Sequence, residues 1–180
     1  MEECLSDIRK ILDDNNQDFF LVCGTLLGQQ RENDFISYDT DIDIGILYDR
    51  YNDNIKDFII QSQNFKLTHV LGKKEDSLEL KFNHKNGIPI DIFLFYPVNN
   101  PVDDYYYCAS FYGVCDSKTD GFCKWGNHIR GFSEIEFKNK KYNIPTNSDE
   151  FLRECYGDWK IPKKFGYEEG LAGDYKNMIN

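Results

Sequence analysis

The chain has 180 residues, a formal net charge of −10, an apolar fraction of 41% and an aromatic fraction of 16%. This length and composition are typical of one globular domain with a sizeable core, and they exclude a largely disordered chain. The acidic balance excludes broad nucleic-acid binding through a basic surface, because the average field of the protein repels polyanions. We therefore expect a single domain over residues 1–180 and no nucleic-acid partner.

The N-terminal residues lack the basic start and long apolar stretch of a secretory signal. The longest apolar runs, at 19–23 and 92–96, are far shorter than the ~20 residues of a membrane-spanning helix. We expect no membrane span and a cytoplasmic location.

Helical and extended patterns alternate in the first part of the chain. Apolar residues at helical spacing predict an amphipathic helix over 2–14, and the run 19–23 predicts a short buried strand. Gly24 would end that strand, and Thr25 is well placed to start a helix with exposed first-turn amides. A strand followed by a glycine and a helix start is typical of phosphate binding.

Three carboxylates at alternate positions come next. In a strand over 41–48, Asp39, Asp41 and Asp43 would project from one face, while isoleucines pack on the other. Like charges on one face repel, so the pattern indicates a hard divalent cation with oxygen ligands.

An EF-hand does not explain these aspartates. Ile44 would occupy the position that needs glycine, and Arg50 the position that needs a bidentate glutamate. A structural calcium loop or a solvated acidic strand remains an alternative to a catalytic cation site.

A further carboxylate interrupts an apolar strand later in the chain. After a helix predicted over 51–63, strands are predicted over 65–71, 77–84 and 88–96 in a mixed or antiparallel sheet. Asp91 lies inside the last of them, and a buried carboxylate is costly unless it is paired or bound to metal. Together with the acidic strand and the glycine turn, Asp91 favours a phosphoryl-transfer site that uses one or two metal ions.

Residues 97–131 have no sustained period, and we predict a partly irregular insertion there. Three thiols and an imidazole in this segment could hold a structural zinc ion: Cys108, Cys115, Cys123 and His128. Because no Cys-x-x-Cys pair is present, we favour unconnected loop cysteines over a zinc site.

The C-terminal segment, 132–180, is predicted to be helical and irregular. Ser148 begins a capped helix that stops at Gly157. Lys163 and Lys164 belong to a positive cluster beyond it, which is either a solvated turn or a clamp for phosphate.

Several separated motifs resemble the LicD/fukutin family of phosphotransferases, which use the nucleotidyltransferase superfold. The similar stretches span about residues 20–165 and are Gly24-Thr-Leu-Leu-Gly28, Arg31, Phe35-Ile36, Tyr38-Asp39, Asp41-Ile-Asp43-Ile and Tyr156-Gly-Asp-Trp159-Lys-Ile-Pro162. The resemblance implies an α+β fold with a mixed β-sheet flanked by helices.

The resemblance also implies an activity. Members of the family move a phospho-alcohol, such as phosphocholine or ribitol phosphate, from a CDP-activated donor to a glycan hydroxyl. By this resemblance Asp41 and Asp43 would bind Mg²⁺ or Mn²⁺, with Asp39 as a further ligand or an outer carboxylate. Asp91 would complete the site as a metal ligand, a general base or both.

The same resemblance assigns the phosphate contacts. Gly24 and Thr25 would face the donor phosphates through main-chain amides, and Arg31 would neutralise charge on the transferred phosphoryl group. Lys163 and Lys164 would close over the pyrophosphate.

Two other functions use the same residues. One is a nucleotidyltransferase that moves the NMP part of an NTP to a small molecule or protein. The other is a catalytically silent binding domain of the same fold, against which the intact carboxylates count.

Overall fold

The computed structural model describes residues 1–98, 104–112 and 121–163. These residues form a mixed α+β fold, as predicted. In chain order its elements are α1 (Glu2–Asp14), β1 (Phe20–Leu21), α2 (Cys23–Glu32), β2 (Ile42–Leu47), the 3-10 helix η1 (Tyr48–Arg50), α3 (Ile55–Gln61), β3 (Phe65–Leu71), β4 (Glu79–His84), β5 (Pro89–Pro97), β6 (Tyr105–Tyr112), β7 (Gly121–His128), β8 (Phe132–Phe137), β9 (Lys140–Pro145) and α4 (Ser148–Tyr156).

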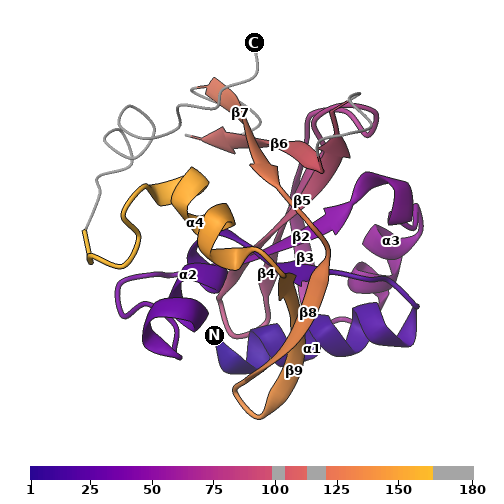
Figure 1. Cartoon of the computed structure of the whole chain (residues 1–180). Coiled ribbons are helices and arrows are strands. Elements are labelled where there is room, and N and C mark those ends of the chain that lie inside the picture. The colour runs from indigo at the N-terminus through magenta and orange to yellow at the C-terminus, as the bar shows by residue number, and fades with distance from the viewer. Residues whose placement is uncertain (99–103, 113–120, 164–180) are drawn as a thin grey trace.

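One mixed sheet organises the molecule (Figure 1). Its strands run in the order β1-β2-β5-β4-β3, and β6 and β7 extend it from the end of β5. Strands β2 and β5 are parallel, whereas their other neighbours pair antiparallel. The two-stranded sheet β8–β9 is separate. The central position of the parallel pair decides which side chains of distant segments become neighbours.

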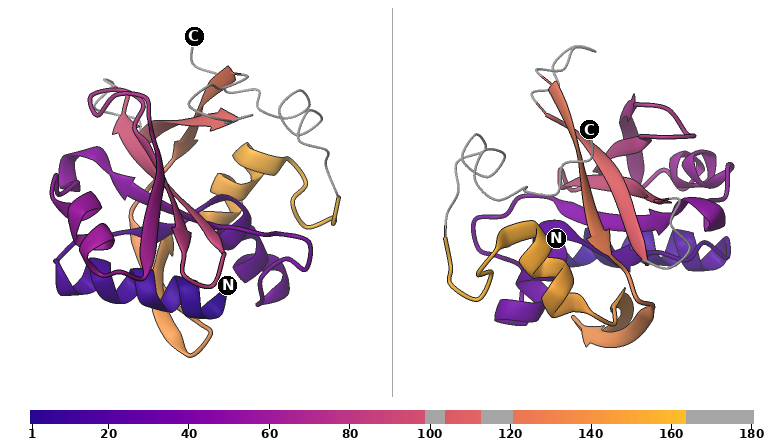
Figure 2. Two further views of the ribbon diagram at one scale, coloured as in Figure 1. Left: turned by 180° about the vertical axis from the view of Figure 1, so that it is seen from behind. Right: turned by 45° about the horizontal axis from the view of Figure 1, so that its top comes forward.

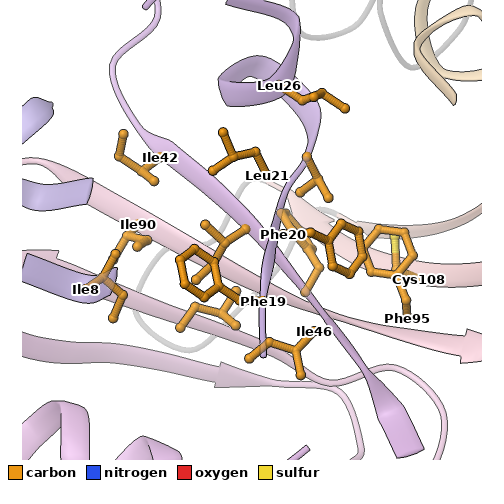
Figure 3. Packing of buried hydrophobic residues seen from close by; sticks show 14 of the residues in the cluster. Ile8, Phe19, Phe20, Leu21, Leu26, Ile42, Ile46, Ile90, Phe95 and Cys108 are labelled. Carbon is orange, nitrogen blue, oxygen red and sulfur yellow. The ribbon is translucent and has the colours of Figure 1, made fainter. Parts of the chain in front are cut away.

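One face of the central strands is packed with aliphatic residues. Ile42 and Ile44 of β2 and Ile90 and Ile92 of β5 are fully buried, as is Ile8 of α1. Figure 3 shows Ile8, Ile42 and Ile90 in the same cluster. Helix α1 forms because its apolar residues recur at helical spacing and present one continuous stripe to this layer.

The opposite face of the same strands is aromatic at one end. The ring of Phe20 lies against those of Phe95 and Phe132, and Phe95 contacts Phe151 of α4. A Cβ at Gly45 would lie 2.6 Å from the Phe20 ring, so the strand needs a glycine at this position. Towards the start of β2 and β5 the aromatic packing gives way to carboxylates.

Two β-hairpins correct the predicted secondary structure. Residues 97–131 contain β6 and β7, so the predicted irregular insertion is wrong over these strands, and β8 and β9 precede the C-terminal helix. Figure 2 shows β6 and β7 reaching away from α1. Their sequences lack a clear two-residue alternation, because Cys108 and Ala109 are successive and both fully buried. Pairing between the strands, rather than local pattern, stabilises this hairpin.

The helix boundaries also differ from the predictions in two places. Helix α2 begins at Cys23 rather than at Thr25, so Gly24 lies within its first turn. The predicted helix 51–63 is shortened to α3 and is preceded by η1. None of the helices in the described part of the chain combines the length and apolar character needed to cross a membrane.

Helix α2 ends where the chain turns back across it. Asn33 adopts a left-handed conformation with φ of 50°, and its amide bonds the carbonyl of Gly28. The following residues then pass so close that a Cβ at Gly28 would lie 2.6 Å from the Asp34 carbonyl oxygen and 3.0 Å from the Ile36 amide nitrogen. This close approach directs the segment that carries the aspartates back towards β2.

Gly28→Ala tests this approach. Alanine normally stabilises a helix by up to about 1 kcal/mol relative to glycine. Here we expect a loss of about 1–3 kcal/mol in the free energy of unfolding, because backbone atoms must move to admit the methyl group. Urea unfolding measures the change. Gln61→Ala, at an exposed position of helix α3, should stay within about 0.5 kcal/mol of wild type. A Gly28→Ala protein as stable as wild type would contradict the packing.

Candidate active site

Three carboxylates meet at the start of the parallel strand pair. Asp41 directly precedes β2, Asp43 lies in β2 and Asp91 lies in β5. One oxygen of each lies within 4.8 Å of the others. Asp43 and Asp91 are directly opposite each other in the parallel register, which explains how residues 48 positions apart in the chain become neighbours. The structure thus brings together the three carboxylates singled out by the sequence.

Asp39 lies beside this group rather than on the strand. Because β2 begins at Ile42, Asp39 does not share a strand face with Asp43, and that part of the prediction is corrected. Its carboxyl group, when protonated, instead donates a hydrogen bond to Asp41, and it approaches Gly24. A Cβ at Gly24 would lie 2.2 Å from Asp39 Oδ2, so the missing side chain makes room for the carboxylate.

The carboxyl groups of Asp39, Asp43 and Asp91 have raised pKa values. Burial raises the pKa of Asp43 well above its ordinary value, and the neighbouring carboxylates act in the same direction. Burial and the hydrogen bond with Asp41 raise the pKa of Asp39 to about 7. Burial also raises the pKa of Asp91. A divalent cation would relieve this repulsion, and a set of carboxylate oxygens fits Mg²⁺ or Mn²⁺.

The first turn of α2 holds Asp43 in place. The amide of Gly24 donates to Asp43 Oδ2 at 3.1 Å, and the amide of Asp43 donates to Thr25 Oγ1 at 2.9 Å. The positive end of the helix also favours the carboxylate. Cys23, at the helix start, has φ of 46°, a conformation that costs energy for a residue with a side chain.

These contacts change the roles predicted for Gly24 and Thr25. Both were expected to face donor phosphates through their amides, but the Gly24 amide is bonded to Asp43 and Thr25 is only 1% exposed. In this structure they orient a carboxylate, and the predicted phosphate contact is corrected to that extent. Gly24 still contributes to the wall of the adjacent pocket.

A lysine that the sequence reasoning missed lies on the next strand. Lys81 of β4 bonds Asp91 Oδ2 and also pairs with Glu79 Oε1 at 2.7 Å. Burial disfavours its charge, but Asp91 and Glu79 outweigh this and raise the pKa of Lys81 above its ordinary value. The available signal was Glu79 and Lys81 alternating with Leu80 and Phe82 in a strand otherwise suited to burial.

A pocket of about 170 Å³ opens beside Gly24 and Asp39. Arg31 and Lys163 line it, which brings together two cations predicted to contact phosphate; Lys164 lies outside the described residues. Arg31 Nη1 donates to the Trp159 carbonyl at 3.4 Å, and Nη2 pairs with Glu32 at 2.8 Å. The remaining lining is partly apolar and aromatic and comprises Leu27, Ile36, Tyr38, Tyr156, Asp158, Trp159 and Ile161.

The predicted zinc ligands that lie in the described residues, Cys108, Cys123 and His128, do not come together in one site. Cys123 pairs with Ser110, so it shares a hairpin face with Cys108, whereas His128 pairs with Tyr105 and therefore points to the opposite face. His128 Nδ1 instead lies 2.5 Å from Glu154 Oε1. Cys115 lies outside the described residues. This arrangement favours the interpretation of unconnected cysteines.

The fold and the carboxylate site define a protein of the nucleotidyltransferase fold. The crystal structure of the lincosamide antibiotic adenylyltransferase LnuA, with lincomycin bound, matches with a TM-score of 0.52. The match covers 88% of both chains at 14% identity, so it concerns the fold alone.

The chain belongs to the LicD/FKTN/FKRP nucleotidyltransferase-domain family, whose model matches residues 16–147. It is 32% identical to the ribitol-5-phosphate transferases FKTN of Homo sapiens and Mus musculus over 164 residues. That alignment covers 91% of this chain and 34% of each relative, so the chain spans about a third of their length. The uncharacterized protein T07A5.1 of Caenorhabditis elegans is 36% identical over 97 residues, which cover 52% of this chain and 26% of that protein.

Asp39→Asn tests the raised pKa of this partly buried carboxyl group without any metal. The raised pKa of Asp39 costs the folded protein nothing below the ordinary value of 3.8, and the cost grows until the pH passes about 7. In EDTA, wild type should therefore lose stability relative to the variant between pH 5 and pH 8, by roughly 1–2 kcal/mol after allowing for solvent screening. Urea unfolding at both pH values gives the difference. The same pH dependence in both proteins would rule out the raised pKa of Asp39.

Proposed function

We propose that this chain is a metal-dependent phosphotransferase. It would move a phospho-alcohol, such as ribitol phosphate or phosphocholine, from a CDP-activated donor to a glycan hydroxyl. The observation that carries the proposal is the group of Asp41, Asp43 and Asp91 beside a pocket that contains Arg31. Membership of the LicD/FKTN/FKRP family and the ribitol-5-phosphate transferase activity in the name of the FKTN relatives support it.

The carboxylates would hold the cation. Asp41, Asp43 and Asp91 each offer an oxygen, and the Gly24 amide keeps Asp43 turned towards the group. A bound Mg²⁺ or Mn²⁺ would supply Lewis-acid stabilisation of charge on the donor pyrophosphate and on the departing CMP. The protein must therefore keep three carboxyl groups, one buried and two partly buried, in one place before the donor arrives.

The pocket would hold the donor. Its cations suit phosphate oxygens, and its aromatic and aliphatic lining suits the less polar parts of a nucleotide. The acceptor hydroxyl oxygen would attack the phosphorus that carries the alcohol, and the bond from that phosphorus to CMP would break. Asp39 lines the pocket and lies beside the carboxylate group, so it is suited to receive the hydroxyl proton.

Product analysis tests the reaction. With Mg²⁺ and a panel of glycan acceptors, we expect release of CMP from CDP-ribitol, CDP-choline or CDP-glycerol. Asp43→Asn should reduce the rate at least about 100-fold, because the cation stabilises the transition state by several kcal/mol. Asp57→Asn, at an exposed position on α3, should leave the rate unchanged.

The other outcomes separate the alternatives. Pyrophosphate released from an NTP, without CMP from any CDP-alcohol, would identify nucleotidyl transfer instead. Neither product, from a protein that still binds a nucleotide, would identify a catalytically silent binding domain. Full activity of Asp43→Asn would contradict the cation site itself.

Arg31→Met tests the pocket. The Arg31 side chain is 9% exposed at the pocket wall, where a charge-assisted bond to phosphate is worth about 1.5–3 kcal/mol. We expect the variant to bind the CDP-alcohol about 10- to 100-fold more weakly, measured from the Mg²⁺-dependent rise in melting temperature as the donor is titrated. Arg153→Met, which removes an exposed arginine of α4, is the matched control and should titrate like wild type. An unaltered titration for Arg31→Met would contradict this role.

A further inference from the structure

A row of charged residues crosses three neighbouring strands at the candidate cation site. Asp43 of β2 lies opposite Asp91 of β5, and Asp91 lies opposite Lys81 of β4. Directly paired residues project from the same face of a sheet, so the row reads carboxylate, carboxylate, ammonium. The ammonium group is therefore an immediate neighbour of one proposed cation ligand.

Lys81 is held on two sides. Its ammonium bonds Asp91 Oδ2 and lies 2.7 Å from Glu79 Oε1. The side chains of Lys81, Asp91 and Glu79 are 18%, 14% and 0% exposed. Charges this deeply buried cannot separate cheaply, because a partner left alone would have neither water nor a counter-charge.

Glu79 links the lysine to the rest of the fold. Its other oxygen, Oε2, accepts the amide of Phe111 in β6 at 2.8 Å. A continuous chain of contacts thus runs from the β6–β7 hairpin through Glu79 and Lys81 to Asp91. Through these contacts Glu79 holds the ammonium group of Lys81 in place, and Lys81 in turn holds the carboxylate of Asp91.

We propose that Lys81 is a positioning residue for the cation site. Its bond to Oδ2 fixes the Asp91 carboxylate and leaves Oδ1 available to the divalent ion that Asp41 and Asp43 would share. The inference rests on the proposed function, since it requires Asp91 to be a ligand of that ion. With one oxygen bonded to an ammonium and the other bound to the ion, Asp91 is a metal ligand rather than the general base.

The direction in which removal of Lys81 changes the affinity for the metal ion distinguishes positioning of Asp91 from simple charge repulsion. A lysine beside a cation site could weaken binding through its charge, and its removal would then tighten binding. Here Glu79 balances that charge at 2.7 Å, so the pair has little net field and the loss of orientation dominates. Partners that orient metal ligands typically contribute 10- to 100-fold in affinity.

The test is the affinity of the full chain for Mn²⁺, measured by electron paramagnetic resonance of the free ion. We expect Lys81→Met to weaken binding about 10- to 100-fold. Lys124→Met is the matched control, because Lys124 lies on a strand, pairs with Asp76 and is 21% exposed, yet belongs to the hairpin away from the carboxylates. It should bind Mn²⁺ like wild type.

A double variant separates positioning from a general loss of structure. In a chain that already carries Asp91→Asn, Lys81→Met should weaken Mn²⁺ binding by less than about 2-fold, since its effect passes through Asp91. Circular dichroism confirms folding of each protein, and Lys81→Gln replaces Lys81→Met if the latter does not fold.

The failures of the two proposals are distinguishable. Unchanged or tighter Mn²⁺ binding by Lys81→Met, with wild type binding the ion and Asp43→Asn losing it, overturns the positioning role alone. A wild-type protein that binds no Mn²⁺ overturns the proposed cation site and this inference together.

Discussion

The parallel pairing of β2 with β5 is the constraint on which the site depends. It puts Asp43 opposite Asp91 in the interior of the sheet, with Asp41 at the strand entrance. Like charges so close together destabilise the folded chain, and this is why compensating groups surround them. The Gly24 amide approaches from one side and the Lys81 ammonium from the other. Burial of the aliphatic layer beneath the strands stabilises the fold and offsets the cost of bringing these carboxylates together.

Helix α2 connects the carboxylates to the pocket. Its first turn bonds Asp43, whereas Arg31 in its last turn lines the pocket and contacts the carbonyl of Trp159. The close approach at Gly28 brings the segment with Asp39 back between them. A single rigid helix therefore sets the separation between the proposed cation site and the proposed donor pocket. A fixed separation suits the proposed phosphoryl transfer, because catalysis of that reaction depends mainly on position and charge.

The local sequence patterns correctly predicted the elements that have one buried side and one exposed side. The first helix, the strand at 65–71 and the helix from Ser148 agree with the structure, because one side of each meets the core and the other meets solvent. The hairpin β6–β7 was missed, since Cys108 and Ala109 are both buried and alternation disappears. Helix α2 starts earlier than predicted because bonds to Asp43 stabilise its first turn and offset the conformational cost at Cys23.

The sequence by itself determined the family and the residue types of the site, because motif order and alternate aspartates are properties of neighbouring positions. Only the tertiary structure decided which residues of distant segments contact the residues of the site. Asp91 became a neighbour of Lys81 through an antiparallel register, and Arg31 reached Trp159 across 128 positions of chain. Thr25 likewise became a support for Asp43 once both were buried. Such contacts depend on how strands and helices pack, and local sequence cannot specify distances between segments that only folding brings together.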